Sequence, residues 1–228
     1  MSHALKALAF SLIFGVSVAT ANDAPNTLRE INLTASAATA VIAGLQEKIN
    51  AGAARPEDID LNRLKGAYRA AYARMANKDM AGVEDAELRR VHDAMDRALG
   101  QVMEQFRADI LKGGQDAFVP AFFRAQLFTR FNDLMGDRYR AVVTNRRQEL
   151  INRDSAPERV IENAEILKQI NEWLERGHMQ AETRSIGGNS FGFWPMTITE
   201  PCMVCHQRNG LQQRIGQFGG ATVIMSNR

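Results

Sequence analysis

Apolar and small residues recur at alternating steps of three and four in the first half of the chain, which is the spacing of a helical stripe. The first stripe comprises Leu28, Ile31, Ala35, Ala38, Ile42, Leu45 and Ile49. It predicts a helix that ends near Gly52. After Arg55-Pro56-Glu57-Asp58 the pattern restarts and predicts a second helix. The stripe of this helix comprises Leu61, Leu64, Tyr68, Ala71 and Met75.

A third helix is predicted after Gly82, and the pair Gly113-Gly114 is a typical stop signal for it. Its apolar face comprises Leu88, Val91, Met95, Ala98, Val102, Phe106 and Ile110. Short helices gain most of their stability from packing, so we expect the three stripes to bury against one another or against a partner. These helices define a helical section over residues 22–112.

The pattern changes after Gly113. Residues 115–135 are rich in phenylalanine and predict a helix entered through Pro120. Ser155-Ala156-Pro157-Glu158 matches a capping box and predicts another helix that runs to Gly177. The core face expected for this helix comprises Ile161, Ala164, Leu167, Ile170 and Leu174.

Short runs rich in β-branched or aromatic residues predict strands near residues 139–144, 179–186, 190–199 and 219–226. We therefore expect three to five antiparallel strands in the C-terminal half. The predicted fold class is α+β, with the N-terminal helical section packed on an antiparallel sheet within residues 113–228.

The composition is that of a globular protein. Of the 228 residues, 45% are hydrophobic and 24% are charged, which is too apolar for a disordered chain and enough for one large core or two small ones. The formal net charge is only +2, and no basic block occurs. We therefore expect no binding to nucleic acid.

The N-terminus has the three parts of a secretory signal peptide. Residues 1–6 are short and basic, residues 7–18 are apolar, and Ala19-Thr20-Ala21 places small residues before a cleavage site. The apolar run is shorter than the roughly 20 residues that cross a bilayer. We expect residues 1–21 to be removed before Asn22, leaving a periplasmic protein without a membrane span.

The two cysteines lie in Cys202-Met203-Val204-Cys205-His206, which is the pattern of covalent haem attachment. Both thiols add to the haem vinyl groups, and a helical turn brings the two sulfurs to one porphyrin edge. His206 is the expected proximal ligand of the iron. A disulfide would close a very small loop and constrain little. A thioredoxin-like dithiol favours a βαβ setting, and zinc would need a further ligand. We expect one covalently attached haem c.

The iron position opposite His206 is either occupied by a side chain or vacant, and the sequence leaves both alternatives open. His92 and His178 are expected to be solvated rather than ligands. Methionines near the motif are Met179, Met196, Met203 and Met225. Met196 is the favoured ligand because Phe191-Gly192-Phe193-Trp194-Pro195-Met196 should form apolar lining. A methionine ligand favours electron transfer, whereas a vacant iron can bind a diatomic gas.

Several further segments carry a resemblance to a known family. They are Gly113 to Ala117, Arg140 to Thr144, Asn152-Arg153, Ala156 to Glu158, Phe193 to Met196, the cysteine motif, and Ile215 to Ile224. From Leu99 to Met225 the chain resembles the c-haem-binding domain of unknown function with a PAS-like fold and a C-terminal CxxCH motif. Family members can carry a cysteine after the glycine-rich segment, and the matching residues 118–123 contain none.

The resemblance implies aromatic walls for the haem. The side chains it places around the macrocycle are Phe122, Phe191, Phe193 and Trp194. The two propionates need cations, and the arginine fork suits a carboxylate. The candidate arginines are Arg140, Arg146, Arg147 and Arg184, with Arg140 and Arg184 preferred.

These observations predict a monohaem c-type cytochrome that acts in electron transfer or in haem-based redox or gas sensing. We expect no enzyme, because no distal His and Arg pair stands out. Expected partners are a redox or signalling protein and a diatomic gas, with a homodimer through the N-terminal helices as a further expectation. The alternatives are a cytochrome c′-like helical bundle that binds gas, and a haem-bearing interaction module that works through its N-terminal helices.

Overall fold

The computed structural model describes residues 26–113, 120–144, 161, 163–200, 202–203, 212 and 214–226. The N-terminal helices are α1 (Asn26–Asn50), α2 (Leu61–Ala76), α3 (Ala86–Gln105) and α4 (Arg107–Lys112). The later elements are α5 (Pro120–Met135), β1 (Tyr139–Thr144), α7 (Ala164–Arg176), β2 (Glu182–Ile186), β3 (Asn189–Thr197) and β4 (Phe218–Ser226). The predicted signal peptide and the capping box at residues 155–158 lie outside the described residues.

The predicted helical stripes form the core of the N-terminal section. In α1 every stripe residue except Leu45 is fully buried. Asp60 and Asp85 cap α2 and α3, because each side chain accepts hydrogen bonds from backbone N–H groups of the first turn. Two details of the prediction were wrong. Leu61 is 38% exposed, although its side chain lies beside Gly100 of α3. The third helix is interrupted at Phe106, which separates α3 from α4.

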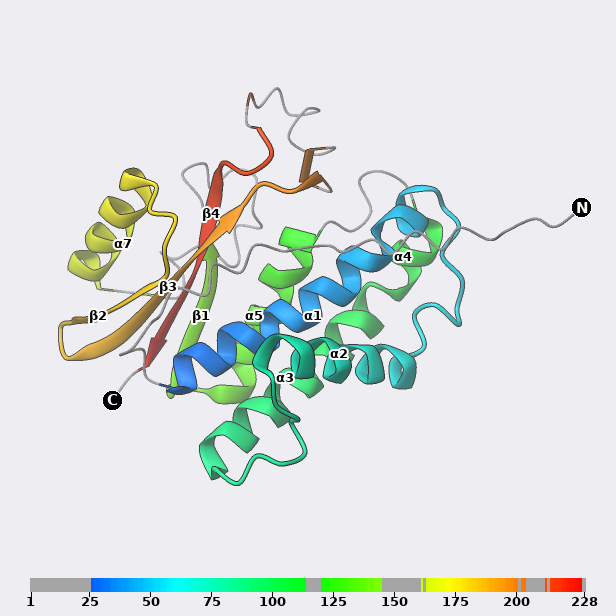
Figure 1. The fold of residues 1–228 in the computed structure, drawn as a ribbon, viewed down its shortest axis with the longest axis horizontal. Helices are drawn as coiled ribbons and strands as arrows, with labels where there is room; N and C mark the ends of the chain where they lie inside the picture. The colour runs from blue at the N-terminus through cyan, green and yellow to red at the C-terminus, as the bar shows by residue number, and fades with distance from the viewer. Residues whose placement is uncertain are drawn as a thin grey trace, which may run out of the picture.

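A four-stranded antiparallel sheet has the order β1-β4-β3-β2. Successive side chains of a strand point to opposite faces, and the helices cover both. The bundle face, which includes Ala141, Val143 and Ile224, packs with α1 and α5 in one core. The opposite α7 face packs under Trp173 of α7 and includes Val142, Phe191, Phe193 and Val223. Figure 1 shows α1 and α5 on one side of the sheet and α7 on the other.

The helix α7 begins later than the capping box predicts. Ile161 is not helical, and Asn163 caps the helix by accepting hydrogen bonds from the N–H groups of Glu165 and Ile166. The expected core residue Ala164 is exposed, and Ile166 is the residue of the first turn that is buried.

The position of Gly113 requires a residue without a side chain. It has φ +68°, and a Cβ there would lie 2.5 Å from the Cα of Gly52. This close approach joins the end of α4 to the end of α1. The prediction of a stop at Gly113 is confirmed.

The α+β class is confirmed, since N-terminal helices pack on a four-stranded antiparallel sheet. The same core cluster contains residues of α1, α3 and α5 together with residues of β1 and β4. The N-terminal helices and one face of the sheet therefore share a core in the described residues. No described helix is long and apolar enough to cross a membrane.

Candidate functional site

Cys202 lies in the connection between the two central strands. Where β3 ends, the Ile198 N–H donates to the Gln217 carbonyl and the Gly216 N–H donates to the Ile198 carbonyl, each at 2.8 Å. These two bonds close the neck of a loop that contains the cysteine motif. Cys202 has helical backbone, and its N–H donates to the Thr199 carbonyl at 3.0 Å.

The thiol of Cys202 is free and half-buried, and its Sγ lies 3.3 Å from Oγ1 of Thr199. Cys205 and His206 lie outside the described residues, so their ligand roles stay predictions. In the described part of the chain, no group of three or more His, Cys, Asp or Glu side chains is arranged to hold a metal ion. Cys202 and Met203, the two described residues of the motif, have helical backbone.

The strand that leads to Cys202 divides the predicted aromatic residues between two faces. Phe191 and Phe193 are fully buried on the α7 face, where the Phe193 ring lies 5.1 Å from the Trp173 ring. Trp194 and Met196 point to the bundle face, where both are half-buried and pack against the helical core. The sequence could not assign these faces, because alternation alone does not say which helix covers which side.

Met196 and Trp194 have close contacts of their own on the bundle face. The Thr222 hydroxyl donates to Met196 Sδ at 3.9 Å. The Trp194 ring lies over Gly192, where a Cβ would come within 2.1 Å of the ring. The lack of a side chain at Gly192 therefore leaves space for the indole ring of Trp194. Ligation of iron by Met196 stays a prediction.

Phe122 lies in a different place from the other aromatic candidates. It is on α5, and its ring packs edge-on against Phe106 with 5.3 Å between centroids. It belongs to the margin of the helical core. The structure therefore does not gather Phe122, Phe191, Phe193 and Trp194 around one space, and their contact with haem stays a prediction.

The two preferred arginines lie on opposite edge strands. On β1, Arg140 pairs with Asp137 at 2.8 Å and also donates to the Gly136 carbonyl. On β2, Arg184 pairs with Glu182, and its guanidinium lies 6.0 Å from the Phe193 ring centre. Arg146 and Arg147 lie outside the described residues. Both described arginines already have acidic neighbours.

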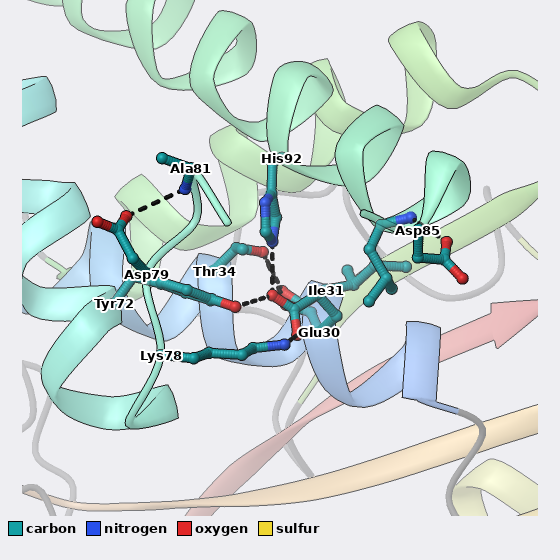
Figure 2. A network of polar contacts seen from close by, with 10 residues as sticks. Glu30, Ile31, Thr34, Tyr72, Lys78, Asp79, Ala81, Asp85 and His92 are labelled. Carbon is teal, nitrogen blue, oxygen red and sulfur yellow. Dashed lines mark hydrogen bonds and ion pairs between the residues drawn. The ribbon is translucent and has the colours of Figure 1, made fainter. Parts of the chain in front are cut away.

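A buried polar cluster in the helical section, shown in Figure 2, was not predicted from the sequence. The Glu30 cluster consists of Glu30 on α1, Tyr72 on α2, Lys78 after α2 and His92 on α3. Lys78 Nζ lies 2.9 Å from Glu30 Oε2, and His92 Nε2 lies 2.5 Å from Oε1. The Tyr72 hydroxyl donates to the same Oε1. The only sequence feature that points to the burial of Glu30 is its position next to Ile31, a residue of the predicted apolar stripe.

The charge of Glu30 is stabilised by its partners. Burial raises the pKa of this carboxyl, but the hydrogen bonds from His92, Tyr72 and Lys78 outweigh it and lower the pKa to about 2. Burial and the neighbouring Glu30 carboxylate raise the pKa of Tyr72 well above its ordinary value. The cluster therefore holds an ionised carboxylate between α1, α2 and α3.

The two histidines differ in their surroundings. His92 is buried, hydrogen-bonded to Glu30, and packed edge-on against Tyr72 at 5.2 Å. His178 is half-buried and stacks on Trp173 at 5.7 Å. The expectation was wrong for His92, because α1 and α2 supply partners that local sequence does not reveal, whereas His178 lies in the loop after α7 as expected.

No protein-family model, curated protein or solved structure matches the chain. The likeness to the PAS-like c-haem family therefore stays a prediction that depends on the residues of this chain.

Proposed function

We propose that this protein is an exported monohaem c-type cytochrome that acts in electron transfer or in haem-based redox or gas sensing. The observation that carries the proposal is the Cys202 to His206 motif, with Cys202 in a helical turn and its thiol free and half-buried. Haem is attached to proteins of this kind outside the cytoplasm, and the predicted signal peptide at the N-terminus would export the chain.

The described residues around Cys202 fit a haem. Cys202 would form one thioether, and Cys205 and His206 would supply the second thioether and the proximal ligand. Trp194 and Met196 offer half-exposed apolar surface on the strand that leads to the motif. When bound, the haem supplies a one-electron iron centre. The protein residues hold it, keep water from one side and tune its potential.

The sheet favours a PAS-like domain over a cytochrome c′-like bundle as the setting of the haem. A four-helix bundle has no place for β1, β4, β3 and β2, which form the sheet next to the motif. Helices on both faces of one antiparallel sheet agree with the PAS-like fold of the family that the sequence resembles. This supports a haem held at the end of the two central strands.

Covalent attachment is the first test. The exported full-length protein is purified and unfolded, and the haem should stay with the polypeptide in acid acetone and add one haem increment to its mass. Cys202→Ala should lose one thioether, and Cys202→Ala with Cys205→Ala should lose the haem altogether. Met203→Ala is the matched control and should keep both bonds. A wild-type chain without covalent haem refutes the proposal.

The ligation of the iron separates the two activities. Optical and resonance Raman spectra of the ferrous protein are recorded with and without CO or NO. A spectrum that gas does not change indicates a closed six-coordinate iron and favours electron transfer. A spectrum that CO changes at once indicates an open position and favours sensing. His206→Ala should keep attached haem and alter both spectra.

A further inference from the structure

Arg124 is a buried cation with only neutral partners. This residue of α5 is 7% exposed. Its Nη2 donates to Asn32 Oδ1 at 2.7 Å, and both Nη atoms lie 3.3 Å from Ser36 Oγ. Its Nε has no hydrogen-bond partner among the described residues, and its Cζ lies 5.5 Å from the Phe128 ring centre.

A buried guanidinium normally has an anion beside it, because an unpaired charge loses its hydration without compensation. Among the described residues no carboxylate forms an ion pair with Arg124, and burial lowers its pKa to about 10. Arg140 and Arg184, which the sequence favoured as anion partners, pair with Asp137 and Glu182 instead. Arg124 is therefore the better candidate for an anion that the described residues do not supply.

The place of Arg124 in the fold links it to the cysteine motif. Arg124 bridges α5 to α1, and these two helices cover the bundle face of the sheet (Figure 1). Trp194 and Met196 are half-buried on that same face, at the end of β3 that leads to Cys202. On the other face Phe191 and Phe193 are fully buried under α7. Partly buried apolar side chains on the side of α1 and α5 thus lie on the strand that leads to Cys202.

We propose that Arg124 binds a carboxylate, and that this carboxylate is a propionate of the haem attached at Cys202, seated against the bundle face. The inference rests on the proposed function. The planar guanidinium suits a carboxylate because two parallel N–H groups can donate to its two oxygens. The free Nε and a neighbouring Nη form such a pair of donors.

The test uses the haem-bearing full-length protein and compares Arg124→Gln with Arg130→Gln. Arg130 lies on the same helix, is partly exposed and already contacts Gln105 and Asp133. Arg124→Gln should lower the haem midpoint potential, because a positive charge near the iron favours the reduced state. It should also shift the propionate bending band of the resonance Raman spectrum. Arg130→Gln should change neither.

Arg124→Lys keeps the charge but loses the planar fork. It should keep the midpoint potential close to that of the wild type while still shifting the propionate band. If Arg124→Gln does not fold, the band of Arg124→Lys decides the question. Attached haem whose propionate band is unchanged in the folded Arg124 variants overturns the inference and leaves the proposed function intact. A wild-type chain without attached haem refutes the proposed function itself, and the two failures are thus distinct.

A free carboxylate is the other source of the same chemistry. Acetate is titrated into the wild-type protein and into Arg124→Lys at constant ionic strength, and urea unfolding is followed. Equal unfolding midpoints with and without acetate support the propionate. Stabilisation of the wild type alone assigns Arg124 to a carboxylate from solution and overturns the propionate assignment.

Discussion

Replacing Glu30 with glutamine tests whether the Glu30 cluster holds the N-terminal helices together. The change keeps the shape of the side chain and removes its charge. Its partners lower the Glu30 pKa from 4.5 to about 2, and a shift of this size corresponds to about 3 kcal/mol of stability near neutral pH. Glu30 is only 4% exposed, so solvent screens this interaction weakly. We expect Glu30→Gln to lower the free energy of unfolding by about 3 kcal/mol.

The assay is urea unfolding of the full-length protein at pH 7, followed by far-ultraviolet circular dichroism. The matched control is Glu87→Gln on α3. Glu87 is partly exposed and pairs with Arg90 and Arg138, so its loss should cost less than about 1 kcal/mol. If Glu30→Gln destabilises the protein no more than Glu87→Gln, the buried carboxylate does not stabilise the helical section and the reasoning is wrong.

The pH dependence of the same pair of proteins has a definite sign. Because folding lowers the Glu30 pKa, its contribution is fully present above the unfolded value of 4.5 and disappears as the pH falls toward about 2. The stability difference between the wild type and Glu30→Gln should therefore be constant from pH 7 to about 5 and shrink below that. A difference that is as large at pH 2.5 as at pH 7 contradicts the assigned pKa.

Gly192→Ala should destabilise the fold by about 1 to 3 kcal/mol, because its Cβ would lie 2.1 Å from the Trp194 ring. Gly44→Ala on α1 meets nothing within 4 Å and should stabilise the fold by about 0.5 to 1 kcal/mol, so equal urea midpoints for the two variants would contradict this packing. Met196→Ala should lower the haem midpoint potential if its sulfur ligates the iron, and the exposed Met179→Ala should leave it unchanged. An unaltered potential and spectrum in Met196→Ala would exclude Met196 as the ligand. Trp194→Ala should shift the haem optical spectrum, and spectra identical to the wild type would place Trp194 away from the haem.

The hydrophobic pattern predicted most of the fold because helices and strands record burial in their own periodicity. The three-and-four spacing of α1 and the β-prone runs of β3 and β4 are visible without any knowledge of what they pack against. The helix α7 was less well placed, since the capping box at Ser155 to Glu158 predicted an earlier start, whereas Asn163 caps the helix in the structure. Of the haem motif, only Cys202 and Met203 lie in the described residues, and both have helical backbone.

The sequence by itself determined the helical stripes, the α+β class and the motif from Cys202 to His206, because each depends on residues a few positions apart. Only the tertiary structure decided that Glu30 meets His92, which is 62 positions away, and that Arg124 meets Asn32, which is 92 positions away. The burial of a charge depends on which distant elements exclude water from it, and no local pattern encodes that choice. For the same reason the sheet face of Trp194 and Met196 became known only once α1 and α5 were seen to cover it.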